Sequence, residues 1–246
     1  MSNRATAAPF PATRWSVVLS ARKHSSPAQS LTAMEDLCRL YWRPLYAFAR
    51  GNGLTPEDAA DRTQDFFSKV IVGQDLLAAA EPCLGKLRTF LLTAFRHDIL
   101  DALRKDRRQK RGAGNIVPLD LAAAEAQLAP SLTVDAQPAR LFEKSWAHSV
   151  ILTALDQLAQ AYAADGKTEI FLQLRPFISL GPDNPASYEE LSGTTGLSKS
   201  TLRQNVHRLR SRFRETIRTI IADPLNDPTD AQIDEELQSL QIALRQ

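Results

Sequence analysis

The sequence predicts an all-α protein in which two small helical domains are joined by a flexible linker. Apolar residues recur at intervals of three and four along almost the whole chain, as they do on one face of a helix, and strand-like alternation is nearly absent. Helix boundaries are marked as well: Gly51 and Gly53 form a stop signal, and Thr55 and Pro56 form a start signal. A chain of 246 residues is long enough for two such domains.

The first predicted domain covers residues 31–111 and follows an N-terminal extension of residues 1–30. Its helices are expected over residues 31–51, 55–71, 75–80 and 85–108. The start of the second helix is the clearest, because Thr55 can cap it and Glu57 and Asp58 lie in its first turn, where negative charge favours the helix dipole.

A linker is predicted at residues 112–138, where Gly, Ala, Pro and acidic residues replace the helical pattern, apart from a helical stretch in 121–128. The second domain covers residues 139–222, and an acidic C-terminal helix lies within residues 223–246. Helices in this half are expected over residues 139–158, 168–178, 187–194, 198–221 and 229–244, with a loop at 181–185.

Charge is segregated along the chain, although the net charge is only +2. Basic residues dominate residues 104–111 and 199–218, whereas acidic residues dominate 223–246. Local concentrations of positive charge are typical of a protein that contacts a phosphate backbone. The alternative for each basic segment is a solvated helix face.

A helix-turn-helix is predicted at residues 188–215. Gly196 can adopt the left-handed conformation of the turn, and Ser198 can cap the second helix. Along that helix apolar residues face inward and polar or basic residues face outward, as in helices that enter the major groove of DNA. The predicted duplex-contacting residues are Ser198, Lys199, Ser200, Thr201, Arg203, Gln204, His207 and Arg208. The alternative is an ordinary amphipathic hairpin with a basic outer face.

A second candidate nucleic-acid surface lies on the helix within residues 87–111, where aromatic and basic side chains share one segment. Bases stack on aromatic rings and phosphates pair with arginine, so this helix can bind duplex or melted DNA. The predicted contacts are Arg88, Phe90, Arg96, His97, Arg104, Lys105, Arg107 and Arg108. The alternative is that Phe90 and Phe95 belong to the core and the basic end belongs to the linker.

These segments resemble the sigma-70 family, and within it the compact extracytoplasmic-function type that keeps only the second and fourth sigma domains. Residues 37–71 resemble the first two helices of the promoter-melting domain, residues 87–111 its promoter-facing helix, and residues 188–210 the helix-turn-helix of the closing domain. The three segments occur in the family's order, with a linker between the domains.

The resemblance implies a subunit that binds core RNA polymerase and contacts double-stranded and melted promoter DNA. The helix from Ser198 would read the minus-thirty-five element, and the helix within 87–111 would read and open the minus-ten element. The residues expected to dock on the clamp helices of the largest polymerase subunit are Asp61, Gln64, Asp65, Phe66 and Phe67. An anti-sigma factor is a further candidate partner.

The sequence departs from the minimal family pattern at several places. Residues 13–21 and the insertion at 75–85 are additions, His97 stands where asparagine is common, and the acidic C-terminal helix is an extra element. The C-terminal helix either packs on the closing domain, restrains its basic face, or caps a small core.

The sequence contains no candidate for catalysis, metal binding or a cofactor. Cys38 and Cys83 are the only cysteines, the histidines are scattered, and residues 165–168 lack the upstream glycine of a phosphate-binding loop. Neither a membrane span nor a secretory signal is present, and we expect a cytoplasmic protein without membrane contact.

Two other functions remain open. A stand-alone helix-turn-helix regulator would bind DNA without core polymerase and would need no docking surface at residues 61–71. A protein-interaction module would direct its basic helices at acidic proteins and would make no sequence-dependent contact with DNA.

Overall fold

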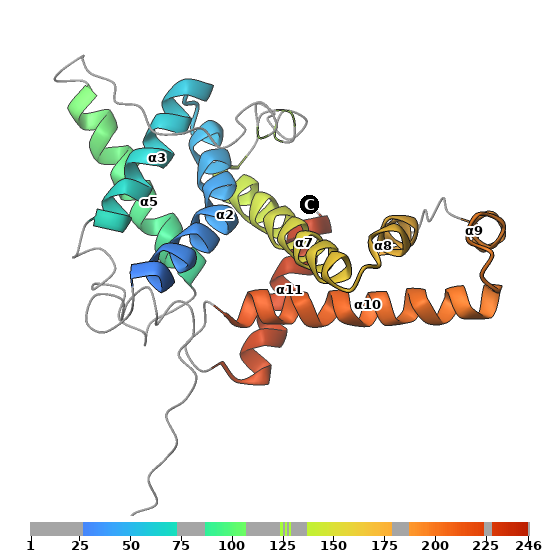
Figure 1. Ribbon diagram of the computed structural model, residues 1–246. Helices are drawn as coiled ribbons and strands as arrows, with labels where there is room; N and C mark the ends of the chain where they lie inside the picture. The colour runs from blue at the N-terminus through green and yellow to red at the C-terminus, as the bar shows by residue number, and fades with distance from the viewer. Residues whose placement is uncertain are drawn as a thin grey trace, which may run out of the picture.

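The computed structural model describes residues 27–72, 87–106, 124, 126, 128, 137–178, 187–223 and 228–245. All regular secondary structure in these residues is helical, which confirms the predicted all-α class. In chain order the helices are α2 (Pro27–Gly51), α3 (Pro56–Val72), α5 (Leu87–Asp106), α7 (Pro138–Ala164), α8 (Thr168–Leu174), the 3-10 helix η2 (Arg175–Ile178), α9 (Tyr188–Thr195), α10 (Lys199–Ala222) and α11 (Asp230–Arg245). Figure 1 shows α2, α3 and α5 gathered at one end of the molecule and α9 at the other, where α10 begins.

An aromatic cluster holds α2, α3 and α5 together. The Phe95 ring of α5 is fully buried, with its centroid 5.0 Å from that of Phe66 in α3 and 6.2 Å from that of Phe48 in α2. The start of α3 is capped as predicted, because the backbone N–H of Asp58 donates to the Thr55 hydroxyl oxygen at 3.2 Å. Local capping signals and helical periodicity therefore account for this part of the fold.

The most extensive helix contact joins α2 to α7, which the sequence prediction assigned to different domains. Gly51 permits a close approach at one end of this contact, since a Cβ there would lie 2.8 Å from Leu141 Cδ1 and 3.0 Å from Pro138 Cα. The buried side chains of both predicted domains form one continuous core. The described residues therefore show no separation of the core where the linker was expected.

Some of the predicted segments lie outside the described residues: the short helix at 75–80, the loop at 181–185 and most of the linker. Within the linker, Ala124 and Leu128 are helical and buried. The predicted N-terminal extension overlaps the first described helix, because α2 begins at Pro27.

The predicted helix over residues 168–178 divides into α8 and η2. Pro176 lies at the division and has no backbone N–H to donate, so the chain tightens into a 3-10 turn over Arg175–Ile178. This turn buries Phe177 beside Tyr188 of α9, with 4.8 Å between the ring centroids. The 3-10 turn therefore places η2 in contact with α9.

Candidate nucleic-acid interface

A short helix, a left-handed turn at Gly196 and a long helix follow one another in residues 188–222, the segment in which the sequence predicted a helix-turn-helix. Gly196 ends α9 with φ of 69°, the left-handed region that favours glycine. The Ser198 hydroxyl oxygen accepts the backbone N–H of Thr201 at 3.2 Å and so caps α10. Ser192 of α9 donates its hydroxyl to the Leu197 carbonyl at 2.7 Å, so side-chain hydrogen bonds hold the turn on both sides.

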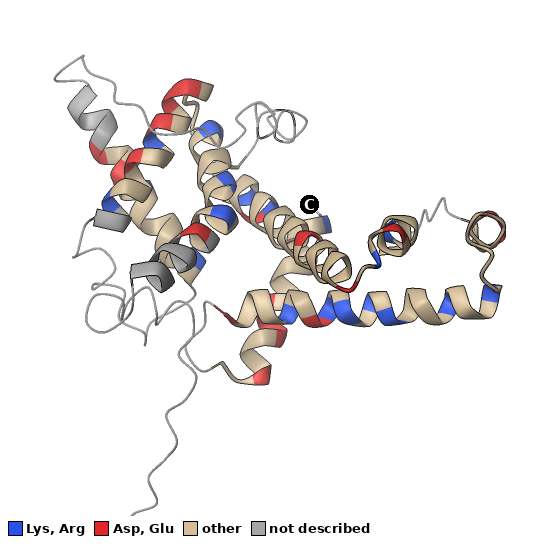
Figure 2. Ribbon diagram, in the orientation of Figure 1, with Lys and Arg blue, Asp and Glu red and all other residues tan. Residues whose placement is uncertain are grey.

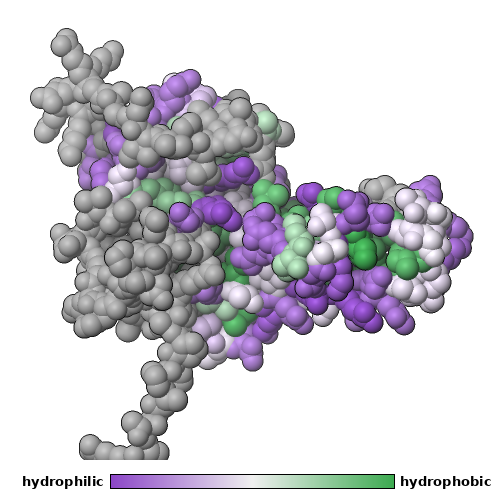
Figure 3. Space-filling view, in the orientation of Figure 1, coloured by the Kyte–Doolittle hydropathy of each residue, from purple (hydrophilic) through white to green (hydrophobic). Residues whose placement is uncertain are grey.

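The first half of α10 divides cleanly into a buried and an exposed face. Its buried residues recur at helical spacing and are Leu202, Val206, Leu209 and Phe213. The predicted contact residues from Ser198 to Arg208 are all exposed. In Figure 2 basic residues follow one another along α10. In Figure 3, drawn in the same orientation, the surface along α10 is largely hydrophilic.

Several basic side chains of α10 are already engaged within the molecule. Lys199 forms an ion pair with Glu189, and the Arg203 guanidinium lies over the Tyr188 ring at 5.7 Å from its centroid. The ion pair also lowers the pKa of Glu189. Arg210 donates from Nε to the Phe177 carbonyl at 2.9 Å. The first two contacts hold α9 against α10, and the third holds η2 against α10. All three reduce the number of cations that face outward without a partner.

The side chains of Arg208 and Arg214 are exposed and make no hydrogen bond or ion pair with any described residue. Arg214 was missed in the sequence prediction, which ended the contact set at Arg208. The spacing contains the signal, because Arg214 follows His207 by two helical turns and therefore lies on the same face. We add Arg214 to the candidate contacts.

The α5 candidates are placed differently from one another. Arg96 and His97 are exposed, and Phe90 is half-buried against the core. Arg104 and Lys105 belong to the helix, but their side chains lie outside the described part of the chain, as do Arg107 and Arg108 altogether. The exposed face of α5 also carries Leu100, an apolar residue that is 43% exposed.

Arg88, predicted to contact DNA, is not accessible to DNA in this structure, because it is only 7% exposed. Its guanidinium lies 2.7 Å from a Glu143 carboxylate oxygen in α7 and 4.3 Å from the centroid of the Trp146 ring. Arg88 precedes Leu91 and Phe95 by three and seven residues, which places it on the buried face of α5. The spacing in the sequence already indicates a buried position, but the prediction placed Arg88 at the surface because of its positive charge.

The predicted docking face on α3 is also corrected in part. Asp61 and Asp65 are exposed and Gln64 is half-buried, so these three can meet a partner. Phe66 and Phe67 cannot, because they are 1% and 4% exposed and their rings contact the aromatic cluster. They belong to the core because the helical period places them on the inner face of α3.

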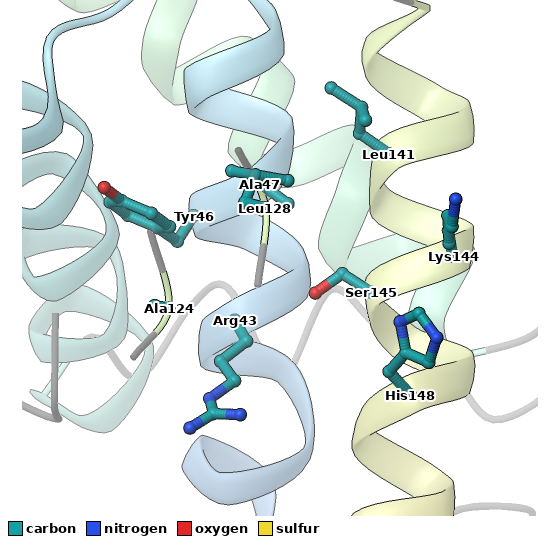
Figure 4. A pocket seen from close by; sticks show the side chains of 9 residues that line it. All are labelled: Arg43, Tyr46, Ala47, Ala124, Leu128, Leu141, Lys144, Ser145 and His148. Carbon is teal, nitrogen blue, oxygen red and sulfur yellow. The ribbon is translucent and has the colours of Figure 1, made fainter. Parts of the chain in front are cut away.

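A small cavity of about 30 Å³ lies between α2 and α7 (Figure 4). Arg43, Lys144 and His148 lie on its wall, with Ser145 directed toward α2. A space of this size has room for about one water molecule. This cavity is separate from the exposed faces of α10 and α3. Its lining includes His148, a histidine with a lowered pKa.

Acid is expected to weaken the fold through His148. Burial, and then the neighbouring Lys144 charge, lower the pKa of this half-buried histidine. The unfolded chain therefore binds a proton more readily than the folded chain, and stability should fall as the pH drops from about 7.5 to about 5.5. Urea unfolding at both values should show a smaller loss in His148→Gln than in the parent protein. His97→Gln, which removes an exposed histidine, is the control, and equal behaviour of the two variants would contradict this prediction.

None of the described helices combines the length and apolar character that a membrane-spanning segment needs. Within the same residues, no group of three or more His, Cys, Asp and Glu side chains is arranged to hold a metal ion. The chain has no match among protein-family models, curated proteins or solved structures.

Proposed function

We propose that this chain is a sigma factor of the extracytoplasmic-function type, which binds core RNA polymerase and directs it to promoters. The observation that carries the proposal is the α9–Gly196–α10 unit. The order of short helix, turn and long helix supports a helix-turn-helix, a motif in which the N-terminal half of the second helix contacts base edges in the major groove. Ser200, Gln204 and Arg208 are exposed on that half and present donors and acceptors of the kind that read base pairs.

In this proposal each exposed face has its own task. The outer face of α10 reads the minus-thirty-five element as duplex, and Arg96 and His97 of α5 contact the minus-ten element. Asp61 and Asp65 of α3 dock on core polymerase. Figure 1 shows α3 and α5 far from the start of α10. This separation supports the proposal that α5 and α10 contact two different promoter elements.

The proposal keeps the two domains of the sequence prediction, residues 31–111 and 139–222, as units that act at separate elements. The protein acts in the cytoplasm without catalysis, metal or cofactor. An anti-sigma factor is a further candidate partner.

Run-off transcription with purified bacterial core polymerase tests the proposal. Fragmented DNA from the protein's own source serves as template, and core alone and protein alone are the controls. Transcripts that start downstream of one shared pair of sequence elements, only when both components are present, support the sigma function. If core polymerase does not bind the protein while the protein binds specific DNA by itself, the stand-alone regulator takes the place of this proposal.

Replacement of Arg208 by alanine should weaken duplex recognition and leave core binding intact. A side chain that pairs with a base edge contributes about 1–3 kcal/mol of discrimination, so we expect about 10- to 100-fold weaker binding of minus-thirty-five DNA. Fluorescence anisotropy with the holoenzyme and a labelled duplex measures the effect. Arg140→Ala, which removes an exposed arginine from the first turn of α7, is the control. Equal losses in the two variants would show that only net charge matters.

Charge reversal at Asp65 should weaken core binding and leave duplex recognition intact. Asp65 is exposed on α3, and an arginine there would face basic partner groups in the proposed complex. Like charges across an interface cost several kcal/mol, and we expect at least about a tenfold rise in the Kd for core polymerase. Glu169→Arg makes the same charge change on α8 and serves as the control. If both variants bind core equally well, α3 does not dock on polymerase.

A further inference from the structure

The acidic helix α11 packs against α7 and α10. Its buried residues are Glu236, Leu240 and Ala243, so the face that reaches the core begins with a carboxylate. Figure 1 shows α11 crossing α10 and continuing toward α7. The helix therefore contacts both α7 and α10, which also pack directly on each other.

Glu236 reaches the first predicted domain through Arg88. The Arg88 guanidinium lies 3.5 Å from a Glu236 carboxylate oxygen and 2.7 Å from a Glu143 oxygen, so α5, α7 and α11 meet at one charge cluster. Arg88 and Glu236 are only 7% and 5% exposed. Tyr41 of α2 adjoins the cluster, where burial raises its pKa and Trp146 donates a hydrogen bond to its hydroxyl.

The first turns of α11, just before Glu236, form ion pairs with α10 at the surface. Arg218 of α10 donates to Asp234 at 2.6 Å and to Asp230 at 3.1 Å. These exposed ion pairs contribute little by themselves. The buried cluster is different. A second positive charge placed beside Arg88 would be shielded from water in this structure, and its burial would cost several kcal/mol.

We propose that α11 is an intramolecular latch that holds α5 against α7, with the Arg88–Glu236 pair as its catch. The inference rests on the proposed function, since two domains that act at separate promoter elements require α7 to leave α2. In the closed arrangement Arg88 is covered by Glu236 of α11 and by Glu143 and Trp146 of α7. Release of α11 removes Glu236, and only the departure of α7 then uncovers Arg88 on the helix that also exposes Arg96 and His97.

The latch is tested with Glu236→Lys in the full chain, which places a cation beside Arg88. Donor and acceptor dyes on cysteines introduced at the exposed positions Thr93 of α5 and Gln160 of α7 report opening, in a background without Cys38 and Cys83. The matched control is Glu235→Lys, the same change at the exposed neighbouring position. We expect Glu236→Lys to increase the low-transfer population at least about tenfold, because like charges at a buried contact cost several kcal/mol, and Glu235→Lys to leave it unchanged.

Core polymerase binding supplies the second readout. Glu236→Lys should bind core several-fold more tightly than the parent protein, because it removes the free-energy cost of opening. Opening without tighter binding, in a protein that does bind core, overturns the latch as a regulator. If no variant binds core but Glu236→Lys still opens, the latch stands and the sigma function fails.

A folded Glu236→Lys protein, judged by circular dichroism, whose energy transfer equals that of the parent overturns the proposal. If this variant does not fold, Glu236→Gln decides, because it removes the charge that pairs with Arg88 and nearly keeps the size of the side chain. A smaller increase in the low-transfer population is then expected, and no increase overturns the latch.

Discussion

Replacement of Arg88 by methionine is expected to destabilise the protein by about 3–5 kcal/mol, although Met matches much of the arginine's volume. The guanidinium contacts Glu143 and Glu236, and its loss leaves the Glu236 carboxylate buried beside a second carboxylate. A charge that keeps its burial but loses its counterion is among the most destabilising changes a core can undergo. Urea unfolding followed by circular dichroism measures the difference.

Two controls separate lost charge pairing from lost packing. Arg96→Met changes an exposed arginine on the same helix and should shift the free energy of unfolding by less than about 0.5 kcal/mol. The triple variant Arg88→Met, Glu143→Gln, Glu236→Gln removes the charges together and should recover most of the stability, because replacing a whole buried ion cluster by neutral groups is often tolerated. Failure of the triple variant to recover would mean that the arginine acts by packing alone.

Truncation of Phe95 to alanine should have an effect of similar size, about 3–5 kcal/mol. The ring is 0% exposed and lies against Phe48 and Phe66, so alanine leaves a cavity among three helices. We expect a lower midpoint in thermal unfolding and no change in the intrinsic affinity of the folded fraction for DNA. The burial of Phe95 agrees with the alternative stated for this helix, in which Phe95 belongs to the core and does not stack on DNA.

Phe90→Ala is the matched comparison on the same helix, because Phe90 is half-buried. Its loss should cost less stability than Phe95→Ala, about 1 kcal/mol for a partly buried ring. If Phe90 stacks on melted DNA in the proposed function, its truncation should lower open-complex formation at unchanged core binding. A larger stability loss for Phe90 than for Phe95 would contradict the packing described for α5.

The sequence was sufficient for features that depend on neighbours along the chain. The cap at Thr55, the left-handed Gly196 and the cap at Ser198 are local, because each requires only a few adjacent residues to adopt one backbone conformation. The exposed face of α10 followed from helical periodicity for the same reason. Arg214 could have been added by extending that periodicity by two turns.

The sequence was insufficient wherever a side chain's environment depends on a helix distant in the chain. Arg88 and Glu143 are 55 positions apart, and no spacing rule pairs them. Phe66 was predicted to lie on a docking surface, but it is buried against Phe95 of α5, which lies 29 positions later in the chain.

The sequence by itself therefore determined the all-α class, the caps and the polar face of α10, since local backbone preferences and a 3.6-residue period decide these. Only the tertiary structure decided that α7 packs on α2, that α11 reaches the core, and that Arg88 is buried. The physical reason is that burial depends on which surfaces come together in space. A charged side chain can join a core whenever distant helices supply its counterions.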